Sequence, residues 1–223
     1  EAHRVHASGP AALFEACARV GVKRVIHFSA IGVDRETLSE FSETKREGEA
    51  GLTGRELDWV ILRPSVVLGP AAYGGSALVR GLAALPVFPV PPAAGPLQVV
   101  QLDDVVRTVL FFLQPGAPAR VELDLAGPDR LTMMEVAARY RRWLGWRPAR
   151  TWRVPAWLMN LGYALGDFAG FLGWRPPMRS VAGKEIVRGA VGDPKPWADL
   201  TGITPQGLDA ALLGRPASVQ ERW

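Results

Sequence analysis

The apolar positions in the first part of the chain alternate between helical spacing and short continuous runs. Behind Pro10, a residue that suits a first helical turn, apolar side chains recur at helical spacing, so we expect a helix over residues 10–21. Residues 24–29 and 57–62 are short apolar runs, and the charged stretch 40–51 between them is typical of a helix. A strand, a helix and a strand with a connection of this length predict a parallel βαβ unit. Parallel strands are covered on both faces, which explains why these runs do not alternate with polar residues.

Beyond residue 70 the pattern becomes looser and then mostly helical. Residues 85–96 contain five prolines and are expected to form a loop. Thr132 and Glu135 have the spacing of a capping box at the start of a helix. The expected helices cover 76–84, 103–113 and 132–146, and the expected strands cover 98–102 and 120–125. We therefore expect an α/β part at residues 1–128 and a helical region at residues 129–223.

The segment 155–174 has the length of a membrane span, with a single charge, Asp167. An aspartate at the centre of a spanning helix costs about 3 kcal/mol. The apolar residues of the segment share one helical stripe, formed by Leu158, Leu161, Ala164, Leu165, Phe168 and Leu172. These features predict a buried or interfacial helix rather than a span.

Composition excludes several classes of protein. Hydrophobic residues make up 48% of the chain and charged residues 22%, which excludes collagen-like and wholly disordered chains. The single cysteine, Cys17, excludes a disulfide scaffold, and with three histidines we expect no metal site. The first residues include neither an initiator Met nor an apolar signal core, so we expect an interrupted chain without a secretory signal.

Charge is unevenly distributed along the chain, whose net charge is +4. Residues 141–190 contain nine basic and two acidic residues, and also five of the eight tryptophans. A basic, tryptophan-rich window favours contact with an acidic partner such as a membrane surface. The alternative is an ordinary solvated basic face. Nucleic-acid binding is not expected, because the basic residues are not part of a recognised motif.

Four ordered segments resemble the extended and atypical short-chain dehydrogenase/reductase superfamily, over roughly residues 8–145. They are Gly21-Val-Lys-Arg-Val-Ile-His-Phe-Ser-Ala30, Thr44-Lys-Arg-Glu-Gly-Glu49, Ile61-Leu-Arg-Pro-Ser-Val-Val-Leu-Gly-Pro70 and Val99-Val-Gln-Leu-Asp-Asp104. Within the superfamily the chain looks most like bacterial relatives of the nucleotide-binding accessory subunit of respiratory complex I. The resemblance implies a Rossmann-like doubly wound parallel sheet, NAD or NADP as cofactor and an unknown small-molecule substrate. It also implies an oxidoreductase or a sugar-nucleotide epimerase/dehydratase relative in the cytoplasm, with membrane association as an option.

The resemblance also sets expectations for the two ends of the chain. Family members begin with a strand and a glycine-rich turn that binds the dinucleotide pyrophosphate, and no such glycine pattern occurs in this sequence. We therefore expect the first βα units and the main phosphate-binding loop to be missing, so that these residues alone are poorly stable and bind dinucleotide weakly or not at all. Residues 129–223 would then form a substrate or cap region. Residues 216–223 resemble a junction that leads, in some members, to a DoxX-like membrane domain.

The resemblance implies the following site. In the family, a Tyr four residues before a Lys donates the proton, and the Lys binds the nicotinamide ribose. Lys45 matches the Lys, but Phe41 occupies the Tyr position and Ile31 occupies the position of the catalytic Ser or Thr. The implied cofactor-binding residues are Ser29, Lys45, Pro64, Ser65, Val66 and Val67.

The sequence is compatible with two alternatives. The chain could be a non-catalytic dinucleotide-binding assembly or membrane-surface module. It could also be an active reductase or epimerase in which Tyr73 replaces the missing proton donor.

Overall fold

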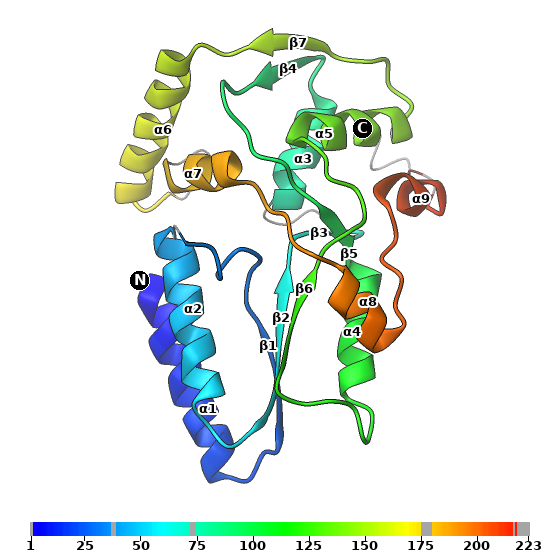
Figure 1. Cartoon of the computed structure of the whole chain (residues 1–223). Coiled ribbons are helices and arrows are strands. Elements are labelled where there is room, and N and C mark those ends of the chain that lie inside the picture. Colours follow the sequence, from blue (N-terminus) through cyan, green and yellow to red (C-terminus); the bar gives the residue numbers. More distant parts are fainter. Residues whose placement is uncertain (1, 37–38, 72–74, 175–179, 216, 218–223) are drawn as a thin grey trace. The chain divides into compact units, whose positions relative to one another are not determined.

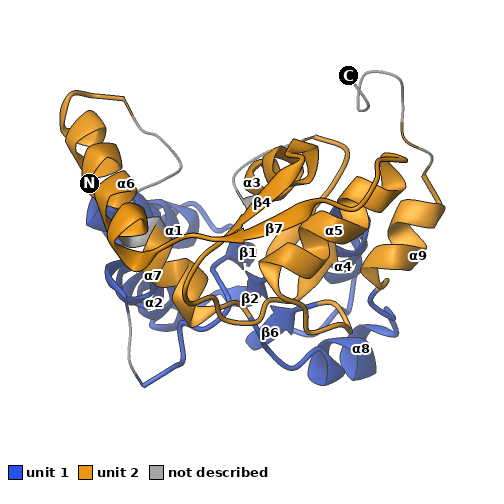
Figure 2. Ribbon diagram, turned by 90° about the horizontal axis from the view of Figure 1, so that it is seen from above, with its two compact units in different colours: residues 1–65, 102–126, 191–205 blue, residues 66–101, 127–190, 206–223 orange. Residues whose placement is uncertain are grey.

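The computed structural model describes residues 2–36, 39–71, 75–174, 180–215 and 217 (Figure 1). The chain divides into two compact units, each assembled from three separate segments (Figure 2). Unit 1 comprises residues 1–65, 102–126 and 191–205, and unit 2 comprises residues 66–101, 127–190 and 206–223. One change from unit 1 to unit 2 falls between Ala126 and Gly127, next to the predicted boundary. The division into residues 1–128 and 129–223 stays a prediction.

Unit 1 contains a parallel sheet with strand order β1-β2-β6. Its elements are α1 (Gly9–Arg19), β1 (Arg24–Phe28), α2 (Glu40–Thr53), β2 (Asp58–Pro64), α4 (Leu102–Phe112), β6 (Val121–Leu125) and α8 (Lys195–Thr201), after a π-helical turn at Arg4–Ser8. Figure 1 shows α1 and α2 on one side of this sheet and α4 and α8 on the other. The predicted βαβ unit is therefore confirmed, and helices lie on both sides of the sheet, while the edge strand β1 stays partly exposed.

Local signals in unit 1 act as expected. Helix α2 begins after Ser39, whose hydroxyl accepts a hydrogen bond from the Ser42 N–H at 3.2 Å and so caps the helix. The core on the α1–α2 side is formed by Phe14, Leu52, Leu57 and Ile61, all of which are buried. This packing fixes α2 against the sheet, and α2 carries the predicted lysine.

Unit 2 contains two small parallel sheets, β3–β5 and β4–β7, together with five helices among the described residues. Its elements are β3 (Val66–Leu68), α3 (Gly75–Ala84), β4 (Val87–Val90), β5 (Val99–Gln101), α5 (Met133–Trp143), β7 (Arg150–Arg153), α6 (Ala156–Phe171), α7 (Ser180–Arg188) and α9 (Leu208–Leu213). The core lies around α3 and α5 and includes Leu68, Val79, Val99, Val136 and Tyr140. The capping box of Thr132 and Glu135 is confirmed at the start of α5.

Strand β4 corrects one prediction, because it lies inside the stretch 85–96 that was expected to be a loop. Phe88 pairs with Thr151 of β7, more than sixty positions further along the chain. The proline content of the stretch conceals this strand, since its partner is distant in sequence and Pro89 lacks an N–H for the ladder.

The predicted helix over 155–174 is α6, with 16 residues. Among the described residues, no helix has both the length and the apolar character that a membrane crossing requires.

Candidate functional site

The carboxyl ends of the three strands of unit 1 are joined by backbone hydrogen bonds. The Ser29 N–H donates to the Leu62 carbonyl at 2.8 Å, just after β1 ends. The Ile31 N–H donates to the Pro64 carbonyl at 3.3 Å, at the end of β2, and the Ser65 N–H donates to the Leu125 carbonyl at 3.0 Å, at the end of β6. Ser29, Pro64 and Ser65 therefore share one edge of the sheet, which is the edge where parallel α/β sheets bind ligands.

Ser29 is the buried polar residue of this edge. Its exposed fraction is 6%, and its Oγ has no hydrogen-bond partner among the residues that the structure describes. A buried hydroxyl without a partner costs about 1–3 kcal/mol. A ligand with polar atoms at this edge would satisfy that hydroxyl, so this residue fits a bound dinucleotide.

Lys45 reaches the same edge from α2. Its Nζ donates a hydrogen bond to the Phe28 carbonyl, the last of β1, at 3.2 Å. Burial lowers the pKa of Lys45 from its usual value, while the nearby charge of Glu49 opposes this effect. The Phe28 carbonyl belongs to the peptide group that leads into Ser29, so the lysine ammonium lies beside the peptide that joins Phe28 to Ser29. An ammonium carries three N–H donors, of which this bond uses one.

Phe41 lies one helical turn before Lys45, where the resemblance places a tyrosine. Its ring meets the ring of His6 edge-on, with 5.2 Å between centroids. His6 Nδ1 also forms a hydrogen bond with Thr44 Oγ1 at 3.1 Å. Burial, and then the charge of Lys45, lower the pKa of His6. Position 41 itself therefore has an aromatic ring without a transferable proton.

A buried ion pair between α2 and β2 is a feature that the sequence-based prediction missed. Arg63 Nε donates to Glu49 Oε1 at 2.9 Å, and Arg63 Nη2 donates to Glu49 Oε2 at 2.6 Å. Arg63 Nη2 also donates to Glu122 Oε2 of β6 at 2.6 Å. The side-chain exposures are 12% for Arg63 and 6% for Glu49.

The charges around Arg63 stabilise its protonated form. Burial alone would lower the pKa of Arg63, but the hydrogen bonds and charge of Glu49, with the charge of Glu122, raise it above its ordinary value. The pair joins the middle of α2 to the carboxyl end of β2. Because Glu49 lies one turn after Lys45, the pair holds the helix in the position from which Lys45 reaches β1. The spacing of Lys45 and Glu49, and a lone arginine in an apolar run, were the available signals.

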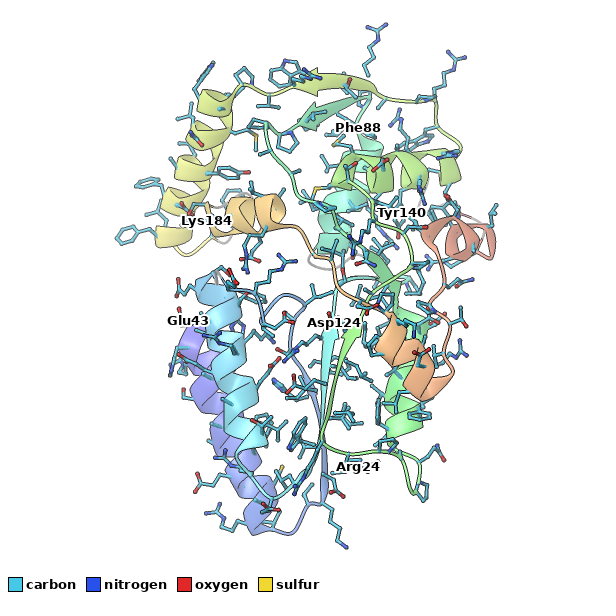
Figure 3. All side chains as sticks on the ribbon, viewed as in Figure 1. Arg24, Glu43, Phe88, Asp124, Tyr140 and Lys184 are labelled. Atoms are coloured by element: carbon cyan, nitrogen blue, oxygen red, sulfur yellow. The ribbon has the colours of Figure 1, made fainter. Side chains whose placement is uncertain are left out.

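Asp124 is a further ionisable residue at the carboxyl edge (Figure 3). It lies opposite Arg63 in the β2–β6 register. Burial, and then the charge of Asp34, raise its pKa, while the charge of Arg63 and the Asp193 N–H oppose the rise. Over the described part of the chain, the acidic, histidine and cysteine side chains do not come together as a metal site.

Val66 and Val67 are the last of the predicted cofactor-binding residues, and they follow Ser65 directly in the chain. Val66 and Val67 form β3 of unit 2, where they pair with Val99 and Val100 of β5. Tyr73, the candidate substitute for the proton donor, lies outside the described residues. His27, on β1, packs edge-on against Phe14 with 5.3 Å between ring centroids.

Comparisons with known proteins bear on the cofactor class and on the fold. Residues 3–82 match a family model described as NAD(P)H-binding. A ceramide reductase of Caulobacter vibrioides is 27% identical over 153 residues, which is 69% of this chain and 48% of that protein. The chain thus spans about half the length of this curated relative.

Solved structures share the fold. The enzyme WbmG of Bordetella bronchiseptica, solved with NAD and UDP, has a TM-score of 0.67 at 17% identity, over 95% of this chain and 63% of its own. A UDP-glucose 4-epimerase of Thermotoga maritima, solved with UDP-glucose, has a TM-score of 0.66 at 15% identity, over 94% of this chain and 67% of its own. The parallel sheets with their helices are therefore Rossmann-like, as predicted. The likeness to complex I accessory subunits and the DoxX-like continuation stay predictions.

Proposed function

Since the chain contains an NAD(P)H-binding domain with the fold of short-chain dehydrogenase/reductase-like epimerases and dehydratases, we propose that the carboxyl edge of β1, β2 and β6 binds the nicotinamide end of NAD or NADP. Lys45 would bond the ribose hydroxyls, and the Ser29 hydroxyl would bond a polar atom of the cofactor. By the resemblance, the backbone of Pro64, Ser65, Val66 and Val67 would approach the nicotinamide carboxamide.

The proposal rests on the positions of Lys45 and Ser29 at the end of β1. Lys45 Nζ is 3.2 Å from the Phe28 carbonyl oxygen, and within the described residues its two other N–H donors stay available to a ligand. Ser29 adds a buried hydroxyl with no partner in the described residues. A vicinal diol offers oxygens that can accept from the ammonium and bond the hydroxyl, so these two groups suit the ribose of a nicotinamide nucleotide.

We further propose that hydride-transfer chemistry is degraded in this site. A bound NAD(P) supplies a hydride acceptor or donor at its nicotinamide ring, but a carbonyl or alcohol substrate also needs a proton donor or acceptor. Phe41 provides no proton at the family's tyrosine position, and Ile31 provides no hydroxyl at the serine position. The dinucleotide would then be held mainly for structure or for sensing the cofactor.

Turnover by the full-length protein tests this proposal. NADH and NADPH would be supplied with a panel of ketones, quinones and sugar nucleotides, and cofactor oxidation would be followed by absorbance. We expect dinucleotide binding without substantial turnover. Robust reduction that is lost in Lys45→Ala, but kept in the exposed control Lys23→Ala, would contradict the non-catalytic proposal.

A second candidate function is attachment to a membrane surface through residues 141–190. A separate observation favours it: large apolar side chains in this window are exposed to solvent, including Trp157 at 67% and Trp174 at 70%. Exposed apolar patches of this kind mark interaction surfaces. Co-sedimentation of the protein with phospholipid vesicles tests the proposal, and an absence of salt-sensitive binding would contradict it.

A further inference from the structure

Helix α6 carries a row of exposed apolar side chains along one face. Their spacing is four, four, three and four residues, which aligns them on one side of a helix. The exposed fractions are 67% for Trp157, 49% for Leu161, 61% for Leu165, 62% for Phe168 and 69% for Leu172. We call these five residues the α6 stripe. Phe171, at 86%, and Trp174, at 70%, extend the apolar surface at the end of the helix.

The opposite face of α6 packs within unit 2 against α7. The Ser180 N–H, at the start of α7, donates to Asp167 Oδ1 at 3.3 Å. Gly183 of α7 lies so close to Tyr163 that an added Cβ would be 2.7 Å from the ring carbon Cζ. Asp167, the single charged residue of α6, thus forms its hydrogen bond with α7 and does not interrupt the stripe. Helix α6 therefore has one packed face and one exposed apolar face.

The length of α6 limits how it can meet a membrane. Its 16 residues extend about 24 Å at 1.5 Å per residue, less than the roughly 30 Å of a hydrocarbon core. A helix with one apolar face and this length suits the interface plane, where the apolar side enters the boundary between headgroups and acyl chains. Tryptophan at both ends of the apolar surface also suits this depth.

Basic side chains lie on β7 and α7, the two elements next to α6. Strand β7 runs directly into α6, and all four of its residues are exposed, among them Arg150, Arg153 and Trp152. Lys184 is exposed on α7, beside α6 (Figure 3). Within the described part of the chain these three cations have no acidic partner. Their charges complement an anionic surface, whereas a second copy docking through the same face would bring like charges together.

We propose that the α6 stripe docks in the plane of an anionic phospholipid membrane, with Arg150 and Arg153 of β7 contacting the lipid headgroups. This inference rests on the second proposed function and names the inserted residues and the lipid class. The apolar side chains supply the insertion, and the arginines supply the preference for negative charge.

The test uses the full chain with sucrose-loaded vesicles of phosphatidylcholine alone and of equal parts phosphatidylcholine and phosphatidylglycerol. We expect binding to the mixed vesicles at least about tenfold stronger than to phosphatidylcholine, with a loss of that preference at high salt. Leu165→Gln with Phe168→Gln should weaken binding to the mixed vesicles by about tenfold or more. Arg150→Gln with Arg153→Gln should remove most of the anionic preference.

A matched control separates the stripe from general hydrophobicity. Leu110→Gln with Leu113→Gln changes two leucines of unit 1 that are exposed by 53% and 59%, and binding should not change. Thermal unfolding of each variant checks that its fold is intact, which is expected because all four stripe and control positions are exposed.

The outcomes distinguish the two levels of the proposal. Vesicle binding that the stripe variant retains would overturn the role of α6 and leave membrane attachment standing. No binding to either vesicle would overturn both. A dimer in sedimentation equilibrium that the stripe variant dissociates, without vesicle binding, would assign the stripe to contacts between copies and overturn the inference.

Discussion

The buried ion pair between Glu49 and Arg63 makes a quantitative prediction for Glu49→Gln. Removing one partner of a buried pair typically costs about 3–5 kcal/mol, because the other charge loses its compensation. Glu122 keeps a 2.6 Å hydrogen bond to Arg63, and the glutamine oxygen can still accept one neutral hydrogen bond. We therefore expect Glu49→Gln to lower the free energy of unfolding by about 2–3 kcal/mol. Urea denaturation at neutral pH measures it, as a lower midpoint with an unchanged slope.

Glu47→Gln is the matched control, since Glu47 lies on the same helix. Its partner is His3 at 3.1 Å, with side-chain exposures of 65% for His3 and 49% for Glu47. An exposed pair of this kind contributes about 0–1 kcal/mol. A loss below about 0.5 kcal/mol for Glu49→Gln, or equal losses for both variants, would refute the reasoning that this pair fixes α2 on the sheet.

Three further predictions concern single positions. Burial, and then the charge of Lys45, lower the pKa of His27 below its usual 6.5, so the fold favours the neutral imidazole. This stabilisation is complete above the pKa of the unfolded state and is lost as the pH falls through the pKa of the folded state. In urea titrations, His27→Gln should therefore lose less unfolding free energy than the unaltered chain between about pH 7 and about pH 5. Gly127→Ala should destabilise by about 1–3 kcal/mol or more, because an added Cβ would overlap the Val99 carbonyl oxygen. Calorimetry should show a much smaller change for Gly81→Ala, where an added Cβ would meet no described atom within 4 Å beyond its own helix backbone and chain neighbours. Phe41→Tyr restores a proton donor one turn before Lys45 and should raise the turnover of NADH with ketones by about a hundredfold in steady-state assays; no gain would argue against Phe41 as the missing catalytic group.

Local sequence patterns predicted the elements whose signals are local. The helix 40–51 and its flanking strands are present as α2, β1 and β2, because apolar runs, a serine cap and βαβ spacing act over a few residues. Strand β4 was missed because its pairing with β7 depends on chain segments more than sixty positions apart. Its prolines suggest a loop when only neighbouring residues are considered.

The residues of the candidate site also fall into those that local motifs indicate and those whose contacts depend on the tertiary structure. Ordered motifs point to Lys45 and Ser29, and the structure places the Lys45 ammonium and the Ser29 backbone beside the last residue of β1. Their role in cofactor binding stays a prediction. Glu49 and Arg63 were not identified, since their contact depends on how α2 lies across β2, which no local pattern specifies. The resemblance indicates that Phe41 occupies the position of the proton-donating tyrosine. The contact of its ring with His6 is visible only in the folded structure.

NADH titration of the full-length protein tests most directly whether the end of β1 binds the nicotinamide ribose through Lys45. Fluorescence of the bound cofactor would be followed for the unaltered protein, Lys45→Ala and the exposed control Lys23→Ala. We expect Lys45→Ala to raise the dissociation constant by about tenfold or more, equivalent to about 1.4 kcal/mol, while Lys23→Ala leaves it unchanged. Equal dissociation constants for all three proteins would contradict the assignment of this edge as the nicotinamide site.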